Sequence, residues 1–204
     1  MIDPPESPWT TLRSQQIYDN PWIRVVEHQV LTPSKTSGIY GTIHYKHKAI
    51  GIIPIDAAGY TWLVGQYRYA LRAYSWEIPE GGGDPAIPRL DSARRELEEE
   101  TGLHAACWQE LFQAHLSNSV GDEVATCFLA WDLTPGPSRP EETEQLEIRR
   151  LPFREAAEMV RNGTITDVMS MVTIQRLELM LLRGEAPAAV AEALSGRGRG
   201  VGQG

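Results

Sequence analysis

The sequence of 204 residues predicts an α+β fold, and three features of the chain lead to that prediction. Short segments rich in β-branched and aromatic residues fill the first third of the chain, as in a set of strands. A glycine-rich loop in the middle runs into a helix that stops at Gly102. Two amphipathic segments nearer the C-terminus predict two more helices. We therefore expect mixed β-sheets around the central helix, preceded by an antiparallel β-hairpin region.

The strands are predicted in chain order from alternation and turn signals. A hairpin is expected from residues 22–32 and 39–46, which flank a turn containing Pro, Ser and Gly. The apolar run at 49–55 predicts a buried strand, and an Asp-Ala-Ala-Gly turn follows it. The other predicted strands are 60–67, 75–78, 106–115, 123–134 and 145–151. The C-terminal helices are expected at 153–162 and 166–183, the second with apolar residues at Val168, Met171, Val172, Leu179 and Leu182.

Composition and pattern together define the domain organisation. Residues 1–47 are predicted to form an N-terminal β region, 48–184 the main domain, and 185–204 a flexible tail rich in Ala, Gly and Arg. Hydrophobic content of 42% and charged content of 23% are globular values. A net charge of −8 without a basic stripe argues against nucleic acid as the main partner. No secretory leader or membrane-spanning run is recognised, so we expect a cytoplasmic protein without a membrane partner.

The central helix has two contrasting faces. Residues three and four apart share a helical face, so Glu96, Glu99 and Glu100 project together. Glu98 points elsewhere. The opposite, apolar stripe that would seat the helix on a core consists of Leu90, Ala93 and Leu97.

The acidic face of this helix suggests a metal site. Oxygen ligands at this density suit Mg²⁺ or Mn²⁺, which bind a few carboxylates, keep waters and bridge to phosphates. A solvated acidic face is the ordinary alternative for a Glu-rich run. The glycine-rich loop before the helix, Arg95 within it and Gly102 after it favour the metal site.

These residues resemble the Nudix hydrolases, whose box reads G-x5-E-x7-R-E-U-x-E-E-x-G-U, where U is aliphatic. Gly81 takes the first position, and residues 95–103 match the second half without a gap. One position departs from the pattern, because Ile87 stands where the box has its first Glu. The resemblance implies the Nudix fold, an α/β/α sandwich with a mixed β-sheet.

Further stretches narrow the resemblance to one branch of the family. Asp-Asn-Pro-Trp at 19–22, Gln-Tyr-Arg-Tyr at 66–69 and Leu-Ser-Asn-Ser at 116–119 are similar to the branch that cleaves nucleoside diphosphate sugars and ADP-ribose. The resemblance implies hydrolysis of a pyrophosphate bond to a nucleoside monophosphate and a sugar phosphate. It also implies a homodimer, because the N-terminal strands in that branch commonly pair or swap with a second subunit. Other Nudix activities, on nucleoside triphosphates or dinucleoside polyphosphates, and a non-catalytic nucleotide-sensing module are the alternatives.

The same resemblance implies roles for individual residues. Mg²⁺, or Mn²⁺ in its place, would be held by Glu96, Glu99, Glu100 and the backbone carbonyl of Glu80. Arg95 would orient the carboxylates or, alternatively, form a surface ion pair. The general base would come from the acidic loop at 140–144, and counting back from the next strand favours Glu142 over Glu144. A solvated acidic loop is the alternative for this segment.

Three candidate substrate contacts lie outside the box. Arg68 is a candidate phosphate clamp, because a guanidinium binds phosphate oxygens through two parallel hydrogen bonds. Trp22 could stack on the nucleobase or pack in the core or an interface. Glu123 is a weaker candidate for an outer metal or substrate contact.

Overall fold

The structure, a computed structural model, describes residues 6–137 and 146–195. Glu142 and Glu144, the two candidates for the general base, lie outside the described residues. The chain forms two compact units, which we call the N-terminal unit (Met1–Lys48 with His115–Val124) and the main unit (Ala49–Ala114 with Ala125–Gly204).

The N-terminal unit is built on an antiparallel sheet in the order β1-β2-β3. Its strands are β1 (Thr10–Asp19), β2 (Ile23–Leu31) and β3 (Ser37–Tyr45). The β2–β3 hairpin agrees with the prediction. Strand β1 was not predicted, because all ten of its residues are exposed and its polar sequence lacks the alternation that marks a half-buried strand. Asn20 makes the turn between β1 and β2, its Oδ1 accepting hydrogen bonds from the backbone N–H groups of Trp22 and Ile23.

A chain of polar side chains crosses this sheet. Ser14 Oγ lies 2.8 Å from Nδ1 of His28, and Nε2 of His28 lies 3.0 Å from Oγ1 of Thr42. Thr42 Oγ1 is also 3.1 Å from Nε2 of His44, whose Nδ1 is 2.7 Å from Oδ2 of Asp122. The chain therefore links β1, β2 and β3 to the 115–124 segment of the same unit.

The main unit contains two sheets, in the orders β7-β4-β9-β8 and β10-β5-β6. Their strands are β4 (Lys48–Ile55), β5 (Tyr60–Arg68), β6 (Ala73–Glu77), β7 (Glu80–Gly83), β8 (Leu103–His115), β9 (Val124–Pro135) and β10 (Glu147–Pro152). Strands β4 and β9 are parallel, whereas β5 is antiparallel to both β10 and β6. The glycine-rich segment, expected to be a loop, forms the short strand β7.

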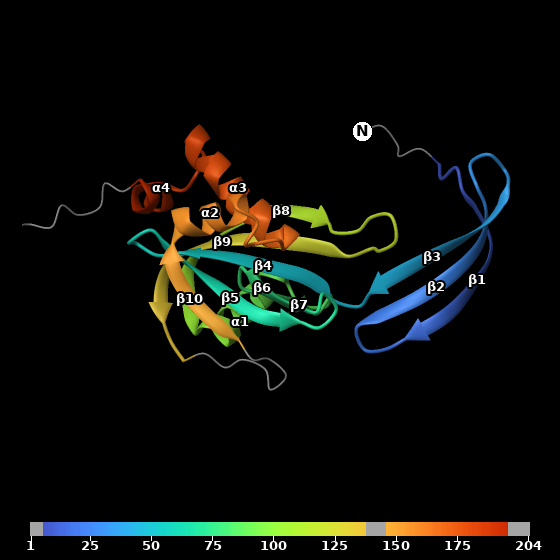
Figure 1. Cartoon of the computed structure of the whole chain (residues 1–204), viewed down its shortest axis with the longest axis horizontal. Coiled ribbons are helices and arrows are strands. Elements are labelled where there is room, and N and C mark those ends of the chain that lie inside the picture. Colours follow the sequence, from blue (N-terminus) through green and yellow to red (C-terminus); the bar gives the residue numbers. More distant parts are fainter. Residues whose placement is uncertain (1–5, 138–145, 196–204) are drawn as a thin grey trace, which may run out of the picture. The chain divides into compact units, whose positions relative to one another are not determined.

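Helices cover both faces of the sheet that contains β4. They are α1 (Arg89–Thr101), α2 (Phe153–Arg161), α3 (Val168–Arg183) and α4 (Ala188–Leu194). Along β4, Ile50 and Ile52 belong to the core cluster that includes the apolar face of α1. Ile53 and Ile55 belong to the cluster formed with α2, α3 and α4. Because alternate strand residues face opposite sides, β4 is buried on both faces and the layers are α/β/α, as Figure 1 shows. The α+β fold with a mixed sheet is confirmed.

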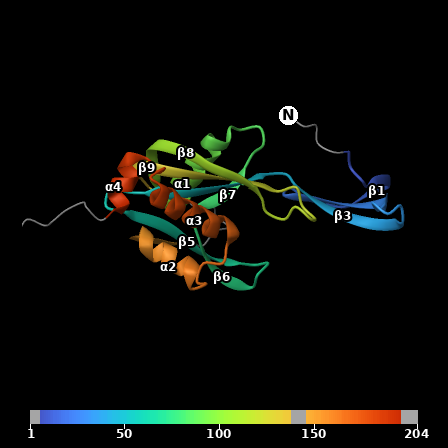
Figure 2. The same cartoon turned by 90° about the horizontal axis from the view of Figure 1, so that it is seen from above.

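Two details at the C-terminus differ from expectation. Helix α4 forms within the segment predicted to be a flexible tail, and its Val190 is buried. A helix of seven residues is too short to reveal its periodicity in an Ala-rich sequence. Helix α3 lies beside α2, where Arg161 of α2 pairs with Glu178 of α3 at 3.1 Å (Figure 2). Its exposed side includes most of the apolar residues noted in the sequence, namely Val168, Val172, Leu179 and Leu182.

Candidate functional site

Helix α1 presents its acidic face to the glycine-rich strand β7. Ala93 and Leu97 are fully buried on the other face, as predicted. Gly102 ends the helix with φ of 69°, and its N–H donates to the carbonyl of Glu98 at 2.8 Å. A left-handed C-cap of this kind favours glycine, so the predicted helix end is confirmed.

Arg95 joins the acidic face to the glycine-rich strand. Its guanidinium donates to carboxylate oxygens of Glu96 and Glu99, both at 2.5 Å, and to the carbonyl of Gly82 at 2.8 Å. Burial lowers the pKa of Arg95, but the charges of Glu96 and Glu99 outweigh it and leave the pKa raised. Gly81 lies directly against Glu96, because a Cβ at position 81 would overlap the Glu96 carboxylate. A side chain at position 81 would therefore displace the Glu96 carboxylate.

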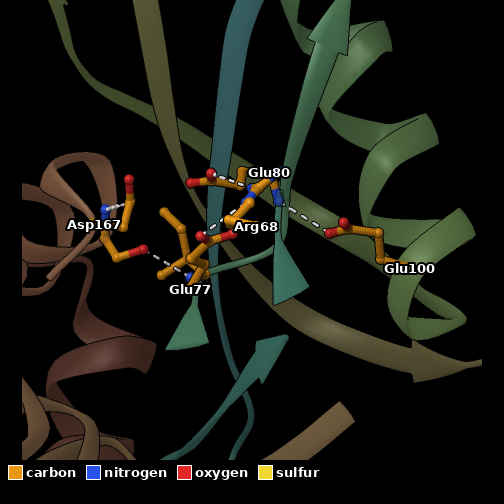
Figure 3. A network of polar contacts seen from close by, with 7 residues as sticks. Arg68, Glu77, Glu80, Glu100 and Asp167 are labelled. Atoms are coloured by element: carbon orange, nitrogen blue, oxygen red, sulfur yellow. Dashed lines mark hydrogen bonds and ion pairs between the residues drawn. The ribbon is translucent and has the colours of Figure 1, made fainter. Parts of the chain in front are cut away.

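Glu80 lies at the start of β7 and contacts both Arg68 and Glu100 of α1 (Figure 3). Its N–H donates to Oε2 of Glu100 at 3.0 Å, and its own Oε1 accepts from Nη2 of Arg68 at 3.0 Å. Its Oε2 is buried and has no hydrogen-bond partner within the described part of the chain. Burial raises the pKa of the Glu80 carboxyl well above its ordinary value, and the negative charges of Asp167 and Glu77 raise it further.

Arg68 is enclosed by carboxylates. Its Nε donates to both carboxylate oxygens of Glu77, at 2.9 and 3.1 Å, and Nη2 donates to Glu77 at 2.5 Å. The side chain of Glu77 is only 4% exposed, so this pair is largely shielded from water. Burial lowers the pKa of Arg68, but the hydrogen bonds and charge of Glu77 outweigh it, and the pKa is raised. The predicted role of Arg68 as a phosphate clamp stays a prediction, and the structure shows its guanidinium held by Glu77 and Glu80.

The start of helix α3 reaches the same network (Figure 3). Asp167 caps the helix by accepting a hydrogen bond from the N–H of Ser170 at 2.7 Å. The hydroxyl of Ser170 in turn accepts from the N–H of Ile78 at 2.9 Å. Sequence reasoning did not select Glu77, Asp167 or Ser170. An Asp directly before an apolar helix is an N-cap signal, but a cap signal does not reveal which distant loop the helix end touches.

The donor set at this site suits a hard divalent cation. Within residues 6–137 and 146–195, no three His, Cys, Asp or Glu side chains are gathered around one point, and the carboxylates of Glu96 and Glu99 are turned toward Arg95. The groups present are nevertheless carboxylate oxygens, the ligands that Mg²⁺ and Mn²⁺ prefer. The buried, unpartnered Oε2 of Glu80 adds an oxygen that lacks a donor among the described residues.

The structure also describes Trp22, Glu123 and Ile87. Trp22 and Glu123 belong to the N-terminal unit. Trp22 is 66% exposed, so it does not pack in the core of this chain. Burial and the charge of Asp122 raise the pKa of Glu123. Ile87 lies in the turn before α1 and is 44% exposed.

None of the helices in the described ranges is long and apolar enough to cross a membrane.

Comparison with known proteins assigns both parts of the chain. Residues 9–43 match the model of the nucleoside diphosphate sugar hydrolase N-terminal domain, and residues 45–167 match the NUDIX domain. An ADP-ribose pyrophosphatase of Mycobacterium tuberculosis is 30% identical over 177 residues, which is 83% of each chain. An ADP-ribose pyrophosphatase of Bacillus subtilis is 27% identical over 172 residues, covering 83% of this chain and 92% of that protein.

A solved structure has the same fold. The crystal structure of an ADP compounds hydrolase superposes with a TM-score of 0.77, covering 87% of this chain and 97% of that one at 19% identity. The chain is therefore a Nudix pyrophosphohydrolase, and it belongs to the ADP-ribose and nucleoside diphosphate sugar pyrophosphatase branch of the Nudix family.

Proposed function

We propose that the protein hydrolyses the pyrophosphate bond of ADP-ribose or a nucleoside diphosphate sugar, releasing a nucleoside monophosphate and a sugar phosphate. The observation that carries this proposal is the packing of β7 against α1, where Gly81 meets the Glu96 carboxylate and Glu100 binds the Glu80 amide. This packing places a row of carboxylates beside an open glycine-rich backbone. The names of the two ADP-ribose pyrophosphatase relatives support this substrate class.

Nudix enzymes generally use divalent metal ions, and the acidic face of α1 is the proposed place for them. Glu96, Glu99, Glu100 and the backbone carbonyl of Glu80 would hold Mg²⁺, or Mn²⁺ in its place. Bound metal would supply positive charge to the phosphates and acidify a coordinated water. Arg95 contacts two of these carboxylates and would act as their positioning residue, keeping both directed toward β7.

The general base is proposed to be Glu142, with Glu144 as the second choice. Both lie outside the described residues, so the proposal rests on their place in the acidic sequence that precedes β10. A carboxylate that takes a proton from the attacking water accelerates such a reaction by roughly 10²–10⁴-fold.

Substrate contacts and assembly complete the proposal. The exposure of Trp22 supports a stacking role on a nucleobase over core packing. Arg68 would attract a phosphate only through the donors that Glu77 and Glu80 do not use. Glu123 would make an outer contact to metal or substrate. The exposed apolar residues of the N-terminal unit support a homodimer formed through its strands, and a cytoplasmic location is proposed for the assembly.

A hydrolysis screen tests the proposal. ADP-ribose, ADP-glucose, UDP-glucose, GDP-mannose, dinucleoside polyphosphates and nucleoside triphosphates are each incubated with Mg²⁺ or Mn²⁺, and products are identified by phosphorus NMR. We expect metal-dependent release of a nucleoside monophosphate and a sugar phosphate. Turnover restricted to triphosphates or dinucleoside polyphosphates would replace the proposed substrate class. Tight binding of a nucleotide without turnover would instead indicate a sensing module.

A further inference from the structure

Helix α3 contacts the site through a hydrogen bond to the backbone before β7. The N–H of Ile78 donates to Oγ of Ser170 at 2.9 Å, across 92 positions of sequence. Both residues are fully buried, so water cannot replace the hydroxyl as acceptor. A buried N–H that loses its acceptor carries the full desolvation penalty, so this single contact strongly constrains the backbone of Ile78.

The position of Ser170 is itself fixed. Its N–H donates to Oδ2 of Asp167, the N-cap of α3, at 2.7 Å. Its neighbours on the buried side of α3 include Met169, Ile174 and Leu177, which anchor the helix in the core. Ser170 therefore connects the first turn of α3 to the backbone between β6 and β7. The Asp167 cap holds the backbone of Ser170 in place.

The segment after Ile78 is held from other directions by the box and its sheet. The N–H of Ile52 in β4 donates to the carbonyl of Pro79 at 2.8 Å, and Glu100 of α1 accepts from the N–H of Glu80. Only Pro79 lies between Ile78, which contacts Ser170, and Glu80, whose carbonyl is the proposed metal ligand. A displaced backbone at Ile78 would therefore move that carbonyl.

We propose that Ser170, held by Asp167, is a positioning residue that sets the backbone of Glu80 for metal binding. This inference rests on the proposed function, because it gives the Glu80 carbonyl the role of ligand. It assigns a part in the site to the first turn of α3, which lies well beyond the glycine-rich strand and α1 in the sequence. Groups that hold metal ligands in place typically change metal affinity about 10–100-fold when they are removed.

The test compares Ser170→Ala with the loss of a buried hydroxyl that makes no such hydrogen bond. Thr61 of β5 is fully buried and its Oγ1 has no hydrogen-bond partner among the described residues, so Thr61→Val is the control. Mn²⁺ affinity is measured by electron paramagnetic resonance on the full chain without substrate, and melting temperature is measured alongside. We expect Ser170→Ala to weaken Mn²⁺ binding about 10–100-fold and Thr61→Val to leave it unchanged.

Turnover gives a second readout of the same variants. Activity lost in Ser170→Ala should return as Mn²⁺ is raised, with the KM for the sugar nucleotide unchanged. If Ser170→Ala matches Thr61→Val in Mn²⁺ affinity, the hydroxyl is only structural and the inference is wrong. If the wild type binds no Mn²⁺, it is the proposed function that fails.

A second pair of variants covers the case in which Ser170→Ala does not fold. Asp167→Asn and Asp167→Ala both remove the charge, but Asn retains an oxygen that can accept from Ser170. We expect Asp167→Ala to bind Mn²⁺ about tenfold or more weakly than Asp167→Asn, because only Asn keeps Ser170 in place. Equal Mn²⁺ affinities for the two variants would overturn the inference.

Discussion

The two units of the chain are stabilised in different ways. In the N-terminal unit, Val30 is the one buried hydrophobic residue among those described, and β1 is exposed along its whole length. In the main unit, β4 is covered on both faces by apolar clusters. The N-terminal sheet therefore depends on backbone pairing and on local side-chain contacts, whereas the main unit has the core of an independent domain. The N-terminal unit therefore has an apolar surface that a partner could cover. Its exposed apolar side chains include Leu12, Ile17, Tyr18 and Ile39.

The largest expected effect lies in the main unit, at the carboxylate that binds the Glu80 amide. Glu100→Gln retains the shape and an acceptor oxygen but removes the charge, so the fold should survive and metal affinity should fall by about 100-fold or more. Isothermal titration with Mn²⁺ measures the change. Glu98→Gln is the matched control, because Glu98 lies on the outer side of α1 near His104. Equal losses in the two variants would mean that α1 attracts cations only through its overall charge.

The next effect concerns the base and sharpens the assignment of chemistry to the main unit. Glu142→Gln should lower kcat by roughly 10²–10⁴-fold while metal and substrate affinities stay near those of the wild type. Single-turnover kinetics with ADP-ribose, beside equilibrium binding, separate the two quantities. A neutral Glu142→Gln together with an impaired Glu144→Gln would move the base by two residues.

A third experiment addresses the N-terminal unit. A charge placed on its exposed apolar surface, as in Ile17→Asp, should weaken dimerisation by about 30-fold or more if this surface is the interface. The melting temperature of the main unit should not change, since Ile17 lies outside both core clusters. Size-exclusion chromatography with light scattering over a dilution series gives the association state. A wild type that is monomeric at every concentration would show that these side chains do not form a dimer interface.

The smallest effect is on stability and follows from the raised pKa of Glu80. The folded metal-free protein binds this proton more tightly than the unfolded chain, so stability falls as pH rises from about 4.5, the ordinary pKa, through the folded value. Glu80→Gln removes this dependence and should raise the melting temperature at neutral pH by roughly 2–4 °C. Calorimetry from pH 5 to 8 without metal tests this. A parallel fall in stability for both proteins would exclude Glu80 as its cause.

Local signals in the sequence were sufficient for some elements of the site and not for others. Ala93, Leu97 and Gly102 define α1 through helical periodicity and a cap, both of which are contained in a few consecutive residues. Strand β1 is held by its pairing with β2 and by surface contacts such as Asp19 with Lys46, since none of its side chains is buried. The enclosure of Arg68 by Glu77 could not be foreseen, because it depends on how β5 and β6 align.

The chain of polar side chains across the N-terminal sheet fixes which atom donates in each of its hydrogen bonds. When Asp122 is ionised and both imidazole rings are neutral, Nδ1 of His44 must donate to Asp122, so its Nε2 must accept from Thr42. Thr42 then accepts from His28, and His28 accepts from the hydroxyl of Ser14. All four hydrogens then point from β1 toward Asp122, so the four hydrogen bonds run in the same direction across the sheet. Because each ring and the Thr42 hydroxyl accepts on one side and donates on the other, the direction of one hydrogen bond sets the direction of the next, from one strand to its neighbour.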